Sequence, residues 1–263
     1  MKVVVTGASG FIGAALVQQL QARGDVVVAL SLRDPLTPAR LKDENPDVVF
    51  HLGWCARGDY LTSAENLDCL AQSLMLVRAL TPGQRLVVAG TCYEHAWAPP
   101  TLYAACKRAL REVVLGLSLD VFWARIHLLY GPGEAPTRLV PAVIRALLKG
   151  QPKSLSAGTQ IRDYLHVDDV AAALRAPLSG THDVGTGVGV SVRALAEEIA
   201  DIVGKPELVR FGAPAKEPPL IVADAEALRA SGWRPRWSLR AGLEDTVAWW
   251  QAKPNDVDAG GST

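Results

Sequence analysis

A tyrosine and a lysine, Tyr103 and Lys107, stand four residues apart in a stretch whose apolar residues recur every three and four positions. On a helix this spacing brings the phenol and the ammonium side by side on one face. A fixed ammonium favours the phenolate, so we expect the pKa of Tyr103 to fall below its usual value of about 10. Such a pair can pass a proton to or from a carbinol oxygen, and the upstream hydroxyl of Thr91 could bind that oxygen. The same spacing is also common on solvated helices.

A glycine-rich loop near the amino terminus is the second candidate site. The residues Thr6–Gly13 read TGASGFIG and lie between a valine-rich run and an amphipathic helical stretch. Glycines let a chain turn tightly and bring backbone N–H groups to the positive end of a helix, where they bind a pyrophosphate. This context predicts a dinucleotide site rather than a purely structural turn. The residues expected at the cofactor are Gly7, Ser9, Gly10, Phe11, Ile12 and Gly13.

The end of the second predicted strand bears on the choice of cofactor. An acidic residue at this place would bind the adenosine ribose, whereas a hydroxyl and an arginine suit a 2′-phosphate. The sequence places Ser31 there and Arg33 two residues later, while Asp34 comes one residue too late to be the obvious ribose ligand. We therefore favour NADP(H), with NAD(H) as the alternative. A solvated loop cation is the other interpretation of Arg33.

Alternating strand-like and helical segments must position these residues. Short β-branched runs between amphipathic segments predict an α/β fold, a Rossmann-type doubly wound parallel sheet. The strands are expected at 2–5, 25–30, 48–52, 85–89 and 121–126, and the helices at 11–22, 63–80 and 103–117. Only 17 residues, three of them prolines, separate Leu30 from Val48, so we expect the third strand to be reduced or missing.

The chain changes character near residue 130. We expect residues 1–130 to form an NAD(P)-binding domain and residues 131–252 a small α/β substrate domain, some strands of which return to the first domain. Helices are expected at 139–148, 167–175 and 192–203, with a short strand at 161–165. Four tryptophans between positions 233 and 250 predict a packed satellite core, with an interaction surface as the alternative. The polar residues 253–263 are expected to be a flexible tail.

Composition excludes several classes of protein. Of the 263 residues 49% are hydrophobic, and 27 basic side chains balance 27 acidic ones, which is unlike a nucleic-acid-binding protein. The four cysteines form no CxxC pair, and no spacing of His, Cys or Asp matches a metal site. The longest apolar runs fall short of the ~20 residues that a membrane helix needs. We expect a cytoplasmic protein without a signal peptide and without a nucleic-acid, membrane or metal partner.

The spacing Gly-x-x-Gly-x-x-Gly in TGASGFIG, followed by Tyr-x-x-x-Lys at 103–107, resembles the short-chain dehydrogenase/reductase superfamily. Within this superfamily the chain is similar to the extended branch, the NAD(P)-dependent epimerase/dehydratase family. The runs 125–133 and 161–171 resemble two further sequence motifs of that family. The resemblance implies an enzyme of nucleotide-sugar chemistry in which Thr91, Tyr103 and Lys107 are catalytic. It also implies cofactor contacts from Leu52, Gly53, Trp54, Asn66, Tyr103 and Lys107, and substrate contacts from Thr91, Tyr93 and Arg162, the last at the substrate diphosphate.

Three departures from the family pattern bear on the reaction. The segment 92–102 is shorter than usual, which trims one loop on the substrate side. Ile126 and Leu128 replace a proline and an asparagine of the family motif. Cys92 and Tyr93 replace the aspartate and glutamate that act as the acid/base pair of the dehydratases.

Glu94 is then the only nearby carboxyl group that could expel water, so dehydration is not expected. We expect an NADPH-dependent 4-ketoreductase that acts on a nucleoside-diphosphate sugar. One alternative is a nucleotide-sugar epimerase with tightly bound NAD, and a second is a non-catalytic protein that senses its dinucleotide. Whether the chain forms a homodimer stays open.

Overall fold

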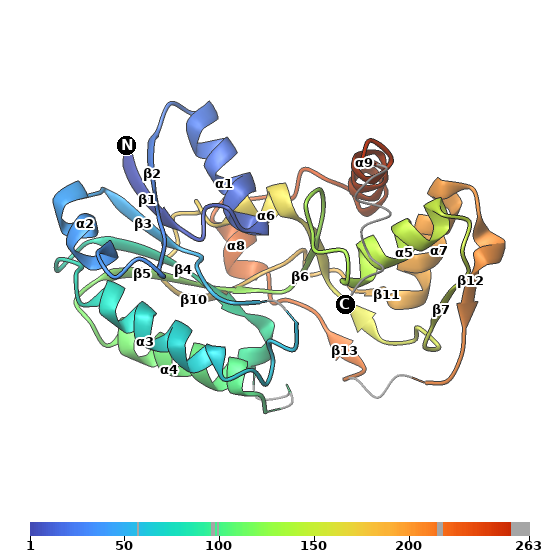
Figure 1. The fold of residues 1–263 in the computed structure, drawn as a ribbon, viewed down its shortest axis with the longest axis horizontal. Helices are drawn as coiled ribbons and strands as arrows, with labels where there is room; N and C mark the ends of the chain where they lie inside the picture. The colour runs from blue at the N-terminus through green and yellow to red at the C-terminus, as the bar shows by residue number, and fades with distance from the viewer. Residues whose placement is uncertain (57, 96–97, 99, 215–217, 254–263) are drawn as a thin grey trace. The chain divides into compact units, whose positions relative to one another are not determined.

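The computed structural model describes residues 1–253 apart from 57, 96–97, 99 and 215–217. Contacts divide the chain into two compact units, each of which is described by itself (Figure 1). The first unit comprises Met1–Ile126, Val170–Val184 and Asp224–Trp233. The second comprises His127–Asp169, Gly185–Ala223 and Arg234–Thr263. None of the helices in the described ranges combines the length and the apolar character that crossing a bilayer requires.

A six-stranded sheet forms the centre of the first unit. Its strands are β1 (Lys2–Thr6), β2 (Val26–Leu30), β3 (Val48–His51), β4 (Arg85–Thr91), β5 (Asp120–Ile126) and β10 (Gly180–Val184). They run in the order β10-β5-β4-β3-β1-β2, and every neighbouring pair is parallel. The Rossmann-type parallel sheet predicted from the sequence is therefore confirmed.

Helices cover both faces of this sheet. They are α1 (Phe11–Ala22), α2 (Thr37–Glu44), α3 (Glu65–Val77), α4 (Leu102–Leu115), α6 (Val167–Ala173) and α8 (Glu226–Ala230). Figure 1 shows α3 and α4 side by side on one face and α1 on the other. The core between the sheet and α4 contains Leu86, Leu110 and Trp123, none of which is exposed. Burial of these apolar side chains ties the helix that carries Tyr103 and Lys107 to the sheet.

The edge of the sheet beside β2 lacks the usual third strand. Between β2 and β3 the described chain forms α2 and no strand, and β2 pairs only with β1. Pro38 stands in the first turn of α2, and the helix ends at Asn45, whose φ of 43° is left-handed. The expectation of a reduced or missing strand between β2 and β3, which came from the length of the connection, is confirmed: the strand is missing.

The second unit contains short strands around three longer helices. Its elements are β6 (Leu128–Tyr130), α5 (Leu139–Leu148), β7 (Lys153–Leu155), β8 (Ile161–Arg162), β9 (Tyr164–His166), β11 (Val190–Ser191), α7 (Val192–Val203), the 3₁₀ turn η2 (Pro206–Leu208), β12 (Val209–Phe211), β13 (Leu220–Ile221) and α9 (Leu239–Gln251). Helices α5, α7 and α9 pack together around a common core, to which they contribute Ile144, Leu195, Leu243 and Trp250. Trp249 packs edge-on against Trp250, so this part of the predicted satellite core is confirmed.

The prediction of a single strand at 161–165 is wrong. The run divides at Asp163 into β8, which pairs with β11 and β13, and β9, which pairs with β6. The buried carboxylate of Asp163 accepts hydrogen bonds from the backbone N–H groups of Thr186 (2.9 Å), Gly187 (2.8 Å) and Ala223 (3.2 Å). Two distant loops thus hold the chain at this residue and break the strand.

Candidate active site

Helix α4 presents the tyrosine and the lysine to the end of β4. The helix is capped by Thr101, whose Oγ1 accepts a hydrogen bond from the backbone nitrogen of Ala104 at 3.1 Å. Lys107 is only 3% exposed, and its Nζ donates to the carbonyl oxygen of Ala89 on β4 at 2.8 Å. The same Nζ lies 5.8 Å from the centre of the Tyr103 ring. The spacing of four residues therefore places both groups on the buried face of α4.

The phenol of Tyr103 is enclosed by neighbours from several elements. Its hydroxyl shares a hydrogen bond with the side chain of Thr91 at the end of β4. Its ring packs edge-on against Tyr60, with ring centres 5.1 Å apart, and against Trp54 at 6.3 Å. Its backbone nitrogen donates to the carbonyl of Leu61 at 3.1 Å, which ties α4 to the loop before α3. The structure thus brings Thr91, Tyr103 and Lys107 together.

The expectation of a lowered pKa at Tyr103 is wrong for this structure. Burial raises the pKa of the phenol well above its ordinary value, and the neighbouring Tyr60 raises it further. The hydrogen bond with Thr91 lowers the pKa by less than burial raises it. The phenol is therefore neutral at physiological pH. In that state it can donate a proton to a carbonyl oxygen.

Burial has the opposite effect on the pKa of Lys107, because it disfavours the charged form of an amine. It lowers this pKa to about 8, although the negative charge of Glu94 raises it in part. The ammonium also lies 3.9 Å from the centre of the Trp54 indole, which is within cation–π distance. Lys107 is thus a largely protonated amine at neutral pH, held in place by a carbonyl and an aromatic face.

The turn after β4 is built around the carboxylate of Glu94, which is 4% exposed. Its Oε1 accepts from the backbone nitrogen of Thr91 at 2.7 Å, closing a capping box over the 3₁₀ turn η1 (Cys92–Glu94). The indole nitrogen of Trp123 lies 3.1 and 2.9 Å from the two carboxylate oxygens, and Nη1 of Arg111 lies 3.2 Å from Oε2. The spacing Thr-x-x-Glu at 91–94 is the sequence signal that predicts this arrangement. The carboxylate binds protein groups and is not presented as the acid that a dehydratase needs.

The glycine loop forms the turn between β1 and α1. Gly7 has a φ of 72°, and a Cβ on Gly13 would lie 2.0 Å from the carbonyl oxygen of Gly7, so glycine is required at both positions. Gly10 caps α1 without a side-chain acceptor, and the first turn holds no acidic residue. The amide of Gly10 itself donates to the carbonyl of Gly7 at 2.9 Å, while among the described residues no side chain caps the first turn of α1. The positive end of the helix is thus left for an anionic ligand, and the loop fits a dinucleotide pyrophosphate. The other predicted loop residues are exposed or half-buried: Ser9, Phe11 and Ile12.

The segment after β3 packs directly against this loop. A Cβ on Gly7 would meet the nitrogen of Gly53 at 2.7 Å, and this nitrogen donates to Oγ1 of Thr6 at 3.2 Å. The predicted cofactor residues Leu52, Gly53 and Trp54 are all half-buried here. The two segments that the resemblance assigns to the dinucleotide are therefore neighbours in space.

Asn66, the predicted cofactor residue at the start of α3, is 1% exposed. Its Oδ1 accepts a hydrogen bond from the indole nitrogen of Trp54 at 2.8 Å. Its Nδ2 donates to the carbonyl oxygens of Tyr60 at 2.7 Å and Ser63 at 2.8 Å. The side chain thus fixes groups of the protein itself, and its contact with a cofactor stays a prediction.

Asp34, the acidic residue that follows β2, is bound by groups of the protein itself. The carboxylate of Asp34 accepts from the backbone nitrogen of Leu36 at 2.9 Å and pairs with Nη1 of Arg40 at 3.2 Å. Ser31 and Arg33 are exposed, and Oγ of Ser31 accepts from the backbone nitrogen of Arg33 at 3.3 Å. Over the part of the chain that the structure describes, no acidic side chain pairs with the Arg33 guanidinium.

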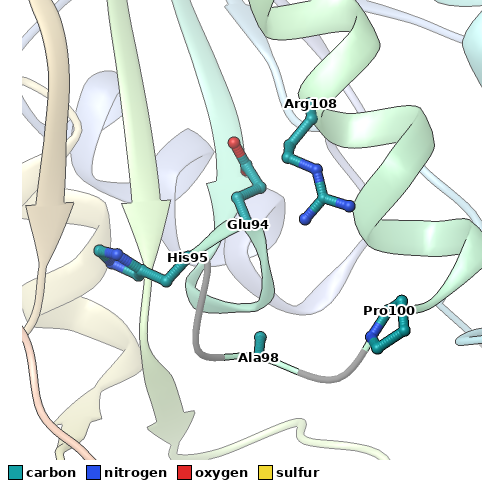
Figure 2. A pocket seen from close by; sticks show the side chains of 5 residues that line it. All are labelled: Glu94, His95, Ala98, Pro100 and Arg108. Atoms are coloured by element: carbon teal, nitrogen blue, oxygen red, sulfur yellow. The ribbon is translucent and has the colours of Figure 1, made fainter.

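A pocket of about 420 Å³ lies beside the Thr91–Glu94 turn, and its lining residues are Glu94, His95, Ala98, Pro100 and Arg108 (Figure 2). Arg108 projects from α4 into this region, whereas His95 turns toward the neighbouring strands. There its Nε2 lies 3.1 Å from both carboxylate oxygens of Asp183 on β10, which also pairs with Nε of Arg125 at 2.8 Å. The sequence offered no signal for this group, because its members come from three different strand ends.

The two further residues predicted to bind substrate lie on different units. Tyr93 is half-buried on η1, and its backbone nitrogen donates to Oγ1 of Thr91 at 3.3 Å. Arg162 lies on β8 of the second unit, is 3% exposed and donates from Nη1 to the carbonyl of Ile161 at 2.9 Å. Their roles toward a substrate stay predictions.

Comparisons with known proteins extend over nearly the whole chain. Residues 3–186 match the profile of the NAD dependent epimerase/dehydratase family. The chain is 30% identical to the UDP-glucose 4-epimerase of Mycolicibacterium smegmatis, over 96% of this chain and 99% of that protein. It is 28% identical to the dTDP-4-dehydro-6-deoxy-D-allose reductase of Streptomyces bikiniensis, over 95% of this chain and 96% of that protein.

Among solved structures, MoeE5 in complex with UDP-glucose and NAD has a TM-score of 0.83 and 28% identity to this chain. The match covers 97% of this chain and 100% of MoeE5. The alignment with the Mycolicibacterium protein spans 320 positions, more than the 263 residues present here. That relative therefore carries insertions with respect to this chain.

Proposed function

Because the chain belongs to the NAD dependent epimerase/dehydratase family, we propose that it uses NADPH to reduce a 4-keto group on a nucleoside-diphosphate sugar. The observation that carries the proposal is the grouping of Thr91, Tyr103 and Lys107 at the end of β4. The glycine loop that fits a dinucleotide belongs to the same unit. Relatives named as a reductase and as an epimerase of nucleotide sugars support the substrate class.

Each of the three side chains has a distinct part in this reaction. A bound dinucleotide would be held by the glycine loop and by Lys107 at its ribose, and it supplies a hydride from C4 of the nicotinamide. Tyr103 donates its phenolic proton to the oxygen of the ketone. Thr91, which already shares a hydrogen bond with the phenol, binds the same oxygen and directs it toward Tyr103. The ammonium of Lys107 then stabilises the phenolate that remains.

Two features favour reduction over the other reactions of the family. The neutral phenol of Tyr103 is in the protonation state that reduction of a ketone requires. The carboxylate of Glu94 is bound by Thr91, Trp123 and Arg111, which argues against a role as a dehydratase acid.

The end of β2 supports NADPH as the reductant. Asp34 is engaged by Arg40, whereas Ser31 and Arg33 are exposed at the place where a 2′-phosphate would lie. A reductase must exchange its cofactor after each turnover, and an exposed binding loop is compatible with that exchange.

Epimerisation with a retained NAD is the second candidate. It is favoured by the 30% identity to a UDP-glucose 4-epimerase and by the likeness to MoeE5, which was solved with NAD. An epimerase uses the same three side chains, but it oxidises and re-reduces one sugar without net consumption of cofactor.

One experiment separates these two reactions. The purified protein is incubated with NADPH and a panel of nucleotide-sugars that includes 4-keto-6-deoxy forms, and the nicotinamide absorbance is followed. Consumption of NADPH that depends on the keto sugar supports the reductase. Bound NAD released on denaturation, together with interconversion of 4-epimers without a change in absorbance, would instead identify an epimerase.

We also propose that the enzyme is a homodimer. Exposed apolar side chains follow each other at a spacing of four residues on α3 (Leu67, Ala71, Met75) and on the adjacent α4 (Ala105, Ala109, Val113). Two such neighbouring stripes form one apolar surface that a second copy would cover. Sedimentation velocity tests this, and Met75→Glu with Val113→Glu should convert a dimer into a monomer; a monomeric wild-type protein would contradict the proposal.

A further inference from the structure

We propose that Trp54 is a positioning residue, whose indole face holds the ammonium of Lys107 against β4 beside Tyr103. The inference rests on the proposed function only in taking Lys107 as the lysine of the active site. In this role Trp54 acts through Lys107 and not on the reacting atoms themselves.

The contact between the two side chains is direct. Nζ of Lys107 lies 3.9 Å from the centre of the Trp54 ring and donates its hydrogen bond to Ala89 at 2.8 Å. Since Lys107 is 3% exposed, the ammonium has lost most of its contact with water. The electron-rich face of an indole is the best aromatic partner for such a desolvated cation. Trp54 therefore replaces part of the solvation that burial removes.

The indole is itself fixed through its ring nitrogen. Its nitrogen donates to Oδ1 of Asn66 at 2.8 Å, and Nδ2 of Asn66 is held by the carbonyls of Tyr60 and Ser63. Asn66 is 1% exposed, so this anchor is buried. The series Asn66–Trp54–Lys107 thus runs from the start of α3 to the middle of α4 and gives the ammonium one defined location.

Other titratable groups also act on Lys107 and must be kept constant in any test. These groups are His51 from β3, Cys69 from α3 and Glu94 from η1, with Tyr103 on α4 itself. Glu94 and Cys69 raise the pKa of Lys107, whereas its charge lowers the pKa of His51. Trp54 differs from all of them because it has no charge and titrates nowhere in the accessible range. Substituting it changes the solvation of the ammonium without adding or removing a charge.

The test follows Lys107 by NMR in protein labelled with ¹³C-lysine, without cofactor or substrate. The Lys107 signal is assigned by its absence in Lys107→Met, and the Cε shift is titrated with pH. Because the ammonium lies over the indole, we expect the Lys107 Hε protons to be shifted upfield by the aromatic ring current. This signature needs only the wild-type protein and the assignment variant.

Three variants then separate the aromatic face from simple packing. Trp54→Leu should abolish the upfield shift and lower the pKa of Lys107 by about one unit. Trp54→Phe retains an aromatic face, so it should keep most of both effects. Trp249→Leu, on α9, is the matched control and should change neither. Thermal unfolding confirms that each variant is folded.

Some results would overturn the proposal. These are a wild-type Lys107 signal at the shift of an ordinary lysine, a Trp54→Leu titration equal to that of the wild type, or equal pKa shifts in Trp54→Leu and Trp54→Phe. If Trp54→Leu fails to fold, the wild-type ring-current shift and the Trp54→Phe titration still decide. Because no turnover is measured, failure of the reductase assignment leaves this test intact.

Discussion

Oε1 of Glu94 lies 2.7 Å from the backbone nitrogen of Thr91, so the carboxylate turns back onto the residue that begins its own turn. The position of the Thr91 hydroxyl beside Tyr103 is therefore coupled to a buried charge three residues away. That charge is balanced by Arg111 from α4, the helix that also carries Tyr103 and Lys107. The end of β4 and helix α4 are thus held together by one carboxylate.

Removing this carboxylate should weaken the fold strongly. Glu94→Ala would leave the N–H groups of Thr91 and Trp123 buried without an acceptor and would leave Arg111 without its inner partner. We expect the free energy of unfolding to fall by about 2–4 kcal/mol in urea titrations. Glu112→Ala removes the exposed partner of the same arginine and should cost less than about 1 kcal/mol. Equal decreases in the free energy of unfolding of the two variants would show that the buried carboxylate stabilises the fold no more than the exposed one does.

Replacement of Tyr103 by phenylalanine tests the proton donor. The variant keeps the ring and its packing, so binding of the cofactor should be unchanged. Turnover should fall by ~10²-fold or more, because only the proton-transfer group has been deleted. Tyr60→Phe, whose ring lies 5.1 Å away, is the matched control and should retain most of the activity. Turnover like that of the wild type in Tyr103→Phe would remove this residue from the mechanism.

The preference for NADPH should depend on Arg33. A guanidinium and a hydroxyl, from Arg33 and Ser31, can bind a 2′-phosphate through charge-assisted hydrogen bonds. Each such bond is worth roughly 1.5–3 kcal/mol, so NADPH should bind about 10- to 100-fold more tightly than NADH. Fluorescence titration with both cofactors measures this ratio. Much of the preference for NADPH should disappear in Arg33→Ala. It should persist in Arg23→Ala, which removes an exposed arginine at the end of α1. Tighter binding of NADH than of NADPH by the wild type would contradict the assignment.

Arg162 is predicted to bind the diphosphate of the substrate. Arg162→Ala should then raise KM for a nucleotide-sugar far more than for the same sugar without its diphosphate. The comparison is needed because the side chain is buried and also donates to the carbonyl of Ile161. Equal effects on both substrates would make Arg162 a structural residue only.

His51 should make the fold sensitive to acid. It is 2% exposed, its ring contacts Oγ1 of Thr6 at 2.8 Å and Oγ of Ser73 at 2.9 Å, and burial lowers its pKa to about 3. Between pH 6.5 and 3 the unfolded chain therefore binds one proton more than the folded protein does at this site. The free energy of unfolding should fall as the pH is lowered, with a contribution of about 1.4 kcal/mol per pH unit.

Urea titrations across this range provide the measurement. His51→Gln should show a smaller pH dependence than the wild type, while His182→Gln, which alters a histidine bound to the carbonyl of Ser179, should not. An unchanged slope in His51→Gln would show that other groups cause the acid sensitivity.

Much of the first unit could be predicted because its central strands are short, continuous apolar runs that are almost wholly buried, whereas helices such as α1 bury only some of their residues. The period of the apolar residues places a helix at 11–22, and α1 occupies those residues. The Tyr-x-x-x-Lys pair also followed from a local rule, since residues four apart on a helix are neighbours. The length of the connection between two strands was enough to predict that a strand is missing.

Properties that depend on residues distant in the sequence could not be predicted. The pKa of Tyr103 is raised because Tyr60 and Trp54, from the segment before α3, help to enclose it, and no local spacing indicates this. The break at Asp163 depends on loops more than twenty residues away. Glu94 is an intermediate case, because its capping pattern is local while its contact with Trp123 is not.

The missing third strand leaves β2 as the border of the sheet, with Val26 62% exposed. A border strand offers a row of backbone donors and acceptors to which an extended segment of another molecule can add. In this protein that row is five residues long, too short to give much adhesion by itself. During folding at high concentration, before the helices have packed, it is nevertheless a ready template for intermolecular β-pairing. Because the missing strand leaves β2 uncovered, the yield of refolded protein should fall as the protein concentration rises.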